Sequence, residues 1–73
     1  MVTAAAEVRR RRFTSTQVKR IRRRLGMTQE QFAEALGIGI ATVQRHERGA
    51  FSPSPLVNDR IARIVDEKLD GRV

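Results

Sequence analysis

One segment of 20 residues, Gln29–Arg48, constrains the fold more than any other part of the chain. It places the small residue Ala33 four positions before Gly37 and continues with Ile38 and, further on, Val43. Two helices that cross steeply through a turn of about three to four residues need a small side chain at the crossing. The turn itself needs a residue that tolerates positive φ, as glycine does. The segment therefore predicts two short helices at a sharp turn, with Ile38 between them and Val43 anchoring the second.

Capping signals divide the whole chain into four helices. A Thr three positions before a Gln, found at Thr14 and Thr28, has the spacing of a capping box that begins a helix. Each of the two Ser-Pro pairs after residue 51 offers a Ser as N-cap and a Pro as the first helical residue. The predicted helices run from Thr14 to Gly26, from Thr28 to Gly37, from near Gly39 to Gly49, and from Leu56 to about Leu69. No stretch alternates in the manner of a strand, so the sequence predicts an all-α fold.

The last predicted helix has more apolar residues than one stripe against the other three helices requires. A chain of 73 residues buries only ~60% of the surface that its unfolded form exposes, so a partner subunit would add needed stability. The surplus residues are Leu56, Val65 and Leu69. We therefore expect a homodimer with these three side chains at a two-fold interface.

The positive charge is concentrated at the start of the chain. The net charge is +7, and residues 1–25 carry nine basic groups against one acidic group. Such a block favours a polyanionic partner, either a nucleic acid or an anionic membrane surface. Residues 1–12 contain four consecutive arginines and few large apolar side chains, which predicts a disordered basic arm; a solvated tail without function fits the same composition.

The residue inventory argues against an enzyme. There is no Cys and a single His, His46, so we expect no metal site, no thiol nucleophile and no cofactor. No Ser has a plausible base partner, and no Gly-rich loop could cradle a phosphate. His46 is interpreted as a packed imidazole. The longest apolar run, Ala4–Ala6, is too short for a membrane span or a signal peptide, which favours a cytoplasmic protein that does not enter a membrane.

The second helix of the Gln29–Arg48 segment leaves one face free for binding. A generic helical hairpin uses similar residues, but it does not require Ala33, Gly37, Ile38 and Val43 together at these spacings. We therefore interpret the segment as a helix-turn-helix. On its free face, Arg45 can bond guanine O6 and N7, and Gln44 can pair with adenine or reach a phosphate. Ile40 and Ala41 can contact thymine methyl groups.

With these residues the chain resembles the phage-repressor and Cro-like, or XRE-type, helix-turn-helix family from Val18 to Ile64. The matching elements are Leu25–Gln29, Phe32–Ala33, Leu36–Ile38 and Glu47–Gly49. The resemblance implies a compact repressor-like domain over residues 13–73, with four helices, or five as in many members. It places the helix-turn-helix at 28–48 and the recognition helix at 40–48.

The resemblance also implies which residues contact DNA. It matches Gln29, Arg48 and the Gly49–Ala50 backbone to phosphate contacts, and Arg22 and Glu47 to a partly buried ion pair between the first and third helices. Gly39 stands where a Ser or Thr usually caps the recognition helix, so it offers a phosphate no side chain. With the basic arm added, the predicted DNA-binding set is Arg9, Arg10, Arg11, Arg12, Gln29, Gly39, Ile40, Ala41, Thr42, Gln44, Arg45 and Arg48.

The function that follows is sequence-specific binding of double-stranded DNA by a transcriptional regulator, a repressor of bacterial or phage origin. One recognition helix reads too few base pairs for useful specificity, so we expect a homodimer on a palindromic operator, at the nucleoid in the cytoplasm. The alternative is an antitoxin that binds a protein toxin and regulates its own operon, with residues 1–12 as the candidate toxin-binding extension. A third interpretation is an architectural or recombination-directionality factor, or a restriction–modification control protein, and the sequence does not separate these.

Overall fold

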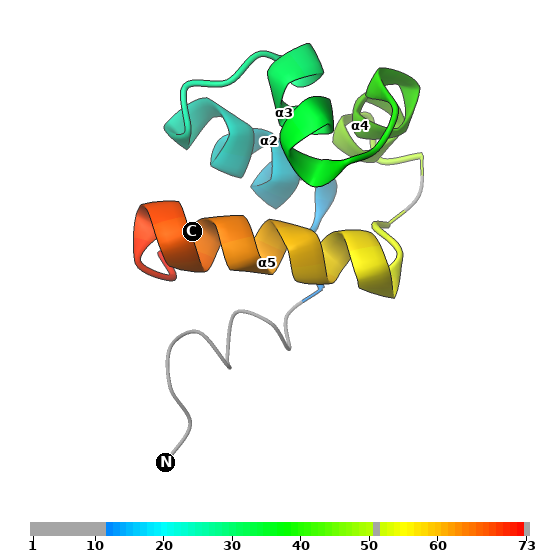
Figure 1. Cartoon of the computed structure of the whole chain (residues 1–73). Coiled ribbons are helices and arrows are strands. Elements are labelled where there is room, and N and C mark those ends of the chain that lie inside the picture. Colours follow the sequence, from blue (N-terminus) through cyan, green and yellow to red (C-terminus); the bar gives the residue numbers. More distant parts are fainter. Residues whose placement is uncertain (1–11, 51, 73) are drawn as a thin grey trace.

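The computed structural model describes residues 12–50 and 52–72. Over these residues the chain forms four helices and no strand: α2 (Ser15–Arg24), α3 (Gln29–Leu36), α4 (Ile40–Glu47) and α5 (Pro55–Leu69). Helices α2, α3 and α4 gather on one side of α5, which runs beneath all three (Figure 1). None of the described helices is long and apolar enough to cross a membrane. The predicted all-α fold of four helices is confirmed.

The helices begin at the capping residues that the sequence predicts. Thr14 Oγ1 accepts from the Gln17 backbone N–H at 3.2 Å while Gln17 Oε1 accepts from the Thr14 N–H at 2.9 Å, and Thr28 with Gln31 repeats the arrangement. Ser54 is the N-cap of α5, which therefore starts with Pro55. Each reciprocal box satisfies backbone donors that the first helical turn leaves unpaired.

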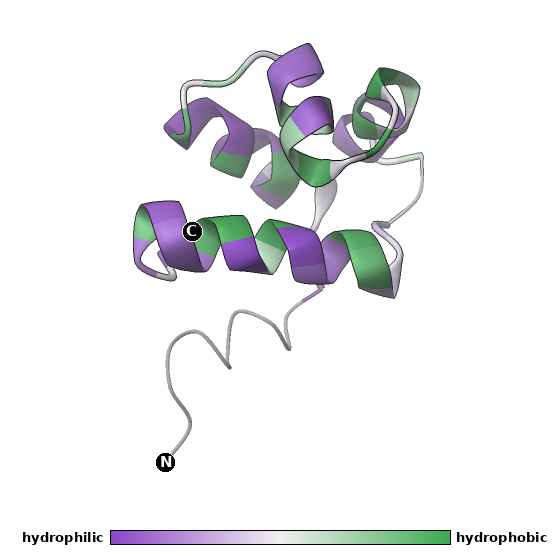
Figure 2. Cartoon of the chain, viewed as in Figure 1, coloured by the Kyte–Doolittle hydropathy of each residue, from purple (hydrophilic) through white to green (hydrophobic). Residues whose placement is uncertain are grey.

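All four helices contribute to one core. Its buried apolar residues are Phe13, Val18, Ile21, Phe32, Ala33, Leu36, Val43, Val57, Ile61, Ala62 and Val65. Ala33, the small residue predicted at the helix crossing, is only 3% exposed, and Ile38 packs against the core from the turn. Figure 2 shows apolar bands on α5 between polar ones, as an amphipathic helix against a core requires.

The predicted dimer interface is wrong for Val65. Its side chain is completely buried because it lies one turn after Ile61 on the face of α5 that covers the other helices. Leu69 is also half-buried and packs against the core. Leu56 alone among the three is exposed, at 61%. The apolar surplus of α5 is thus used mainly inside the domain.

A guanidinium on α5 fixes the turn between α3 and α4. Arg60 Nη1 donates to the carbonyl oxygen of Leu36 at 2.8 Å, at the C-terminal end of α3. The next residue, Gly37, has φ +67°, and a Cβ there would lie 2.9 Å from the same Arg60 nitrogen. Glycine therefore meets two requirements at this position: the left-handed backbone and the room for the Arg60 contact.

The start of the described chain is tied to α5. The Phe13 N–H donates to Oδ1 of the buried Asn58 at 3.1 Å. Phe13 itself is 1% exposed, so the Asn58 side chain supplies the hydrogen-bond acceptor that this buried N–H needs.

Candidate nucleic-acid interface

Helix α4 is held to the core by one side and exposed on the other. Val43 and His46 are 1% and 2% exposed. On the opposite side Ile40, Ala41 and Arg45 are exposed, with Ile40 at 43%. We call these three residues the open row of α4. It presents two apolar side chains and one guanidinium.

The flanks of α4 are less open than the sequence predicts. Thr42 and Gln44, both in the predicted DNA-binding set, are half-buried. Gly39 is the N-cap and makes no side-chain capping bond, as its lack of a side chain dictates. On α4 and its C-cap, the exposed side chains of the predicted set are therefore those of the open row and Arg48.

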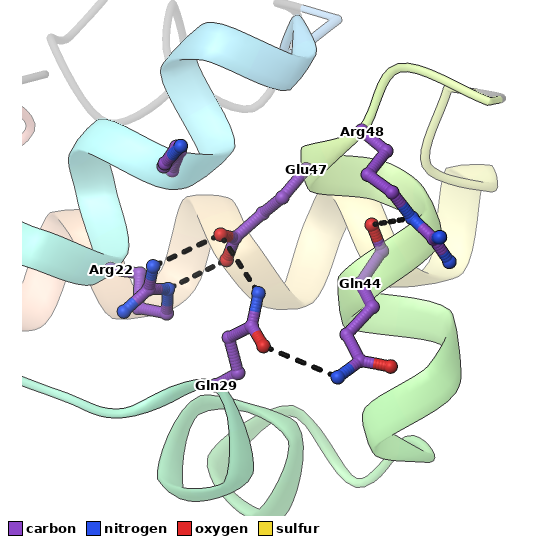
Figure 3. Close-up of a pocket in the computed structure, with 6 residues that line it drawn as sticks. Arg22, Gln29, Gln44, Glu47 and Arg48 are labelled. Carbon is purple, nitrogen blue, oxygen red and sulfur yellow. Dashed lines mark hydrogen bonds and ion pairs between the residues drawn. The ribbon is translucent and has the colours of Figure 1, made fainter.

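A cleft of about 460 Å³ separates α4 from the beginning of α3 and from α2. In Figure 3 the labelled side chains Arg22, Gln29 and Glu47, from α2, α3 and α4, point toward one another across this space. The lining residues are Lys19, Arg22, Gln29, Gln44, Glu47 and Arg48. Three of them are cationic and one is anionic, so the cleft has a positive balance.

Glu47 is the centre of the hydrogen-bond network in the cleft. Its Oε2 accepts from Arg22 Nε at 2.6 Å, and its Oε1 accepts from Arg22 Nη2 at 3.0 Å, a bidentate ion pair. The Glu47 side chain is 4% exposed and that of Arg22 is 15% exposed. Arg22 Nη1 also donates to the carbonyl oxygen of Met27 at 3.0 Å, just before α3. The pair thus joins α2, the end of α4 and the connection into α3.

The same carboxylate determines how two neighbouring amides are oriented. A carboxylate only accepts, so Gln29 turns its Nε2 toward Glu47 Oε1 at 3.3 Å and its Oε1 toward Gln44. Gln44 in turn donates from Nε2 to Gln29 Oε1 at 3.4 Å (Figure 3). Gln44 Oε1 is left facing away from Gln29. Gln44 Oε1 can therefore accept from a base amino group, and the second hydrogen of Gln44 Nε2 remains available as a donor.

Gln29 and Arg48 border the cleft from opposite sides. Gln29 is the first residue of α3 and is half-buried, and Arg48 is exposed at the C-terminal end of α4. Arg48 Nε lies 3.4 Å from the Gln44 carbonyl oxygen, which leaves its other guanidinium donors available. Both residues can thus present N–H groups along the edge of the cleft.

The predicted arginine run is only partly described. Arg9, Arg10 and Arg11 lie outside the described residues. Arg12 is exposed, and its Nη1 donates to the carbonyl oxygen of Pro53 at 3.1 Å. The structure therefore places Arg12 beside the segment before α5.

Sequence reasoning missed two features of the site. Lys19 lines the cleft, and a signal for this existed because it lies one turn before Arg22 on α2. The Gln29–Gln44 hydrogen bond had no signal in the sequence, since it depends on how α3 and α4 are rotated. The described residues contain no group of three side chains that could hold a metal ion.

Comparison with known proteins gives consistent matches. The family model described as Helix-turn-helix matches residues 18–71. A protein of Methanothermobacter thermautotrophicus, named "Uncharacterized HTH-type transcriptional regulator", is 42% identical over 50 residues, which are 68% of this chain and 72% of that protein. Two proteins of Archaeoglobus fulgidus with the same name are 33% and 31% identical over 55 residues, 75% of this chain and 78% and 79% of theirs.

The search of solved structures found no significant match to the chain. The three relatives are archaeal, so the bacterial or phage origin stays a prediction.

Proposed function

This chain belongs to the helix-turn-helix family, and we propose that it is a transcriptional regulator that binds double-stranded DNA with α4 in the major groove. The observation that carries the proposal is the open row of α4 on a helix whose other side is buried. A major groove admits one α-helix and displays a distinct pattern for each base pair. Arg45 offers two parallel donors to guanine O6 and N7, while Ile40 and Ala41 offer apolar contact to thymine methyls.

The cleft beside the open row supplies contacts to the DNA backbone in this proposal. Gln29 gives one hydrogen of Nε2 to Glu47 and keeps the second, which can reach a phosphate oxygen. Arg48 and Lys19 add two exposed cations on the same cleft. Contacts of this kind fix orientation and register, whereas the open row discriminates between bases.

The proposed regulatory mode is repression from a palindromic operator occupied by two copies. A single α4 contacts too few base pairs for a unique site, and two-fold symmetry doubles the length that is read. Leu56, exposed at 61%, is the remaining apolar residue of α5 that a second copy could cover. Sedimentation of the protein with a selected operator tests this, because a complex with one protein per duplex at saturation refutes the paired arrangement.

The test of DNA reading starts from duplexes selected out of a random pool by the wild-type protein. Arg45→Ala is expected to weaken binding to the selected duplex by about 5- to 150-fold, the equivalent of about 1–3 kcal/mol, and to relax the preference at one base step. Arg63→Ala is the matched control, since it removes one exposed guanidinium from α5. An equal loss on selected and random duplexes would show that Arg45 contacts only phosphates.

The basic arm is proposed to add contacts that do not depend on sequence. Deleting residues 1–11 removes Arg9, Arg10 and Arg11 and keeps Arg12 with its bond to Pro53. The slope of log K against log salt is expected to flatten by about two to three units, since each neutralised phosphate contributes about 0.9. An unchanged slope would mean that these arginines do not reach the DNA.

A further inference from the structure

Helix α2 carries a dense group of cations that the ion pair with Glu47 does not use. Its sequence, STQVKRIRRR, contains five basic residues and no acidic one. Arg22 is bound to Glu47, but Lys19, Arg20, Arg23 and Arg24 are exposed. None of these four has an ion pair within the part of the chain that the structure describes. We call them the α2 outer face, and Figure 2 shows that the α2 ribbon is hydrophilic over most of its length.

The four side chains of the α2 outer face surround a shallow hollow. Together with Thr16 they line a depression of about 420 Å³. Lys19 also lines the cleft beside α4, so the depression and the cleft meet at this residue. A continuous positive surface therefore leads from the edge of the proposed DNA interface around α2.

Helix stability alone does not account for this arrangement. Cations in the last turn of a helix are favourable because of the helix dipole, which explains Arg22, Arg23 and Arg24. Lys19 and Arg20 lie before that turn, and each has a like charge four residues later, in Arg23 and Arg24, a spacing that destabilises a helix. A polyanion bound over the Lys19–Arg23 and Arg20–Arg24 pairs would remove the repulsion within each pair.

We propose that the α2 outer face binds the sugar–phosphate backbone of the DNA that flanks the site read by α4, on the same duplex. The proposal rests on the proposed function and extends it beyond the open row. Phosphates need point charges and no base-specific geometry, which matches exposed Lys and Arg side chains without further polar groups. Continuity with the cleft through Lys19 favours the same duplex over a second one. A membrane is disfavoured because this face contains no apolar side chain to insert.

The experiment compares a short duplex, limited to the selected site, with a long one extended by about one helical turn, roughly 10 base pairs, on each side. The test variant is Arg20→Gln/Arg23→Gln/Arg24→Gln, which keeps Lys19 because that residue also lines the cleft. Gln has nearly the helix propensity of Arg, so α2 is expected to keep its helix content. The control variant removes the same charge from exposed positions at the other end of the chain: Arg63→Gln/Lys68→Gln/Arg72→Gln.

On the long duplex, the test variant is expected to flatten the slope of log K against log salt by about two to three units, from about 0.9 per lost phosphate contact. On the short duplex its slope should stay close to that of the wild type, and the control variant should keep both slopes. Equal losses by the two variants would reduce the effect to net charge and overturn the proposal. Equal losses on both duplexes would also overturn it, by placing the contacts within the site itself.

Capture of a second, labelled duplex by wild type but not by the test variant would assign the α2 outer face to another DNA molecule and refute the same-duplex proposal. The proposed function has its own, separate failure: a wild-type protein that selects no sequence and an Arg45→Ala variant that binds like wild type. A flattened slope on long duplexes together with sequence selection therefore supports both proposals, and selection without that flattening removes only this one.

Discussion

The ion pair between Arg22 and Glu47 gives the sharpest test of what holds the domain together. Replacing Arg22 by Met removes the cation and leaves the Glu47 carboxylate, 4% exposed, with the Gln29 amide at 3.3 Å. Removing one member of a buried pair costs about 3–5 kcal/mol, because the remaining charge is desolvated and uncompensated. A domain of this length has a total stability of about 4–11 kcal/mol by per-residue scaling. The single substitution should therefore remove much of the free energy of unfolding.

Urea titration followed by helical circular dichroism measures this loss. With a slope of about 1 kcal/mol/M for so small a domain, the midpoint is expected to fall by about 3 M or more. The double variant Arg22→Met/Glu47→Leu should recover most of the loss, since an apolar pair of similar volume is often as stable as the buried ion pair. Asp59→Asn is the control, because it breaks the exposed Asp59–Arg63 pair, with 44% and 66% exposed side chains, worth less than about 0.5 kcal/mol.

Two results would refute this reasoning. A loss of less than about 1 kcal/mol in the free energy of unfolding for Arg22→Met would mean that the buried pair contributes no more than a surface ion pair. A double variant no more stable than Arg22→Met alone would show that the cost does not come from an uncompensated carboxylate. Should Arg22→Met fail to fold, the double variant still decides between the two explanations.

Two further predictions concern the turn and the start of the described chain. Gly26→Ala and Gly37→Ala should each cost about 1–2 kcal/mol, because φ is +68° and +67°. Gly37→Ala should cost about 1 kcal/mol more, since its Cβ displaces Arg60 from the Leu36 carbonyl; equal urea midpoints would show that this bond contributes nothing. Asn58→Ala should cost about 1–3 kcal/mol and speed hydrogen exchange at the Phe13 amide, which loses a buried acceptor, and an unchanged exchange rate would contradict this.

The helix boundaries could be predicted because the signals that set them are local. A capping box joins residues three positions apart, and the boxes at Thr14 and Thr28 form without reference to the rest of the molecule. The same holds for Gly37, whose positive φ follows from its place after α3. Local chemistry therefore gave the element order and the helix-turn-helix spacing.

The burial of α5 and the contacts of the cleft could not be predicted in this way. Leu56 and Val65 are both apolar, and only the rotation of α5 against the other helices makes one 61% exposed and the other fully buried. The Arg60–Leu36 bond spans 24 residues and the Gln29–Gln44 bond spans 15. Such contacts depend on the packed arrangement of helices, which no short-range pattern encodes.

The orientation of α4 is determined from two sides, and this separates the roles of its residues. Val43 and His46 hold it to the core, while Glu47 ties its C-terminal end to Arg22 on α2. A rotation of α4 that moved Arg45 would have to break one of these attachments. Arg22→Met should therefore change DNA affinity as well as stability, although Arg22 is 15% exposed and bound to Glu47. Arg45→Ala should change affinity alone, because the exposed Arg45 side chain makes no hydrogen bond or ion pair within the described residues and its removal leaves both attachments intact.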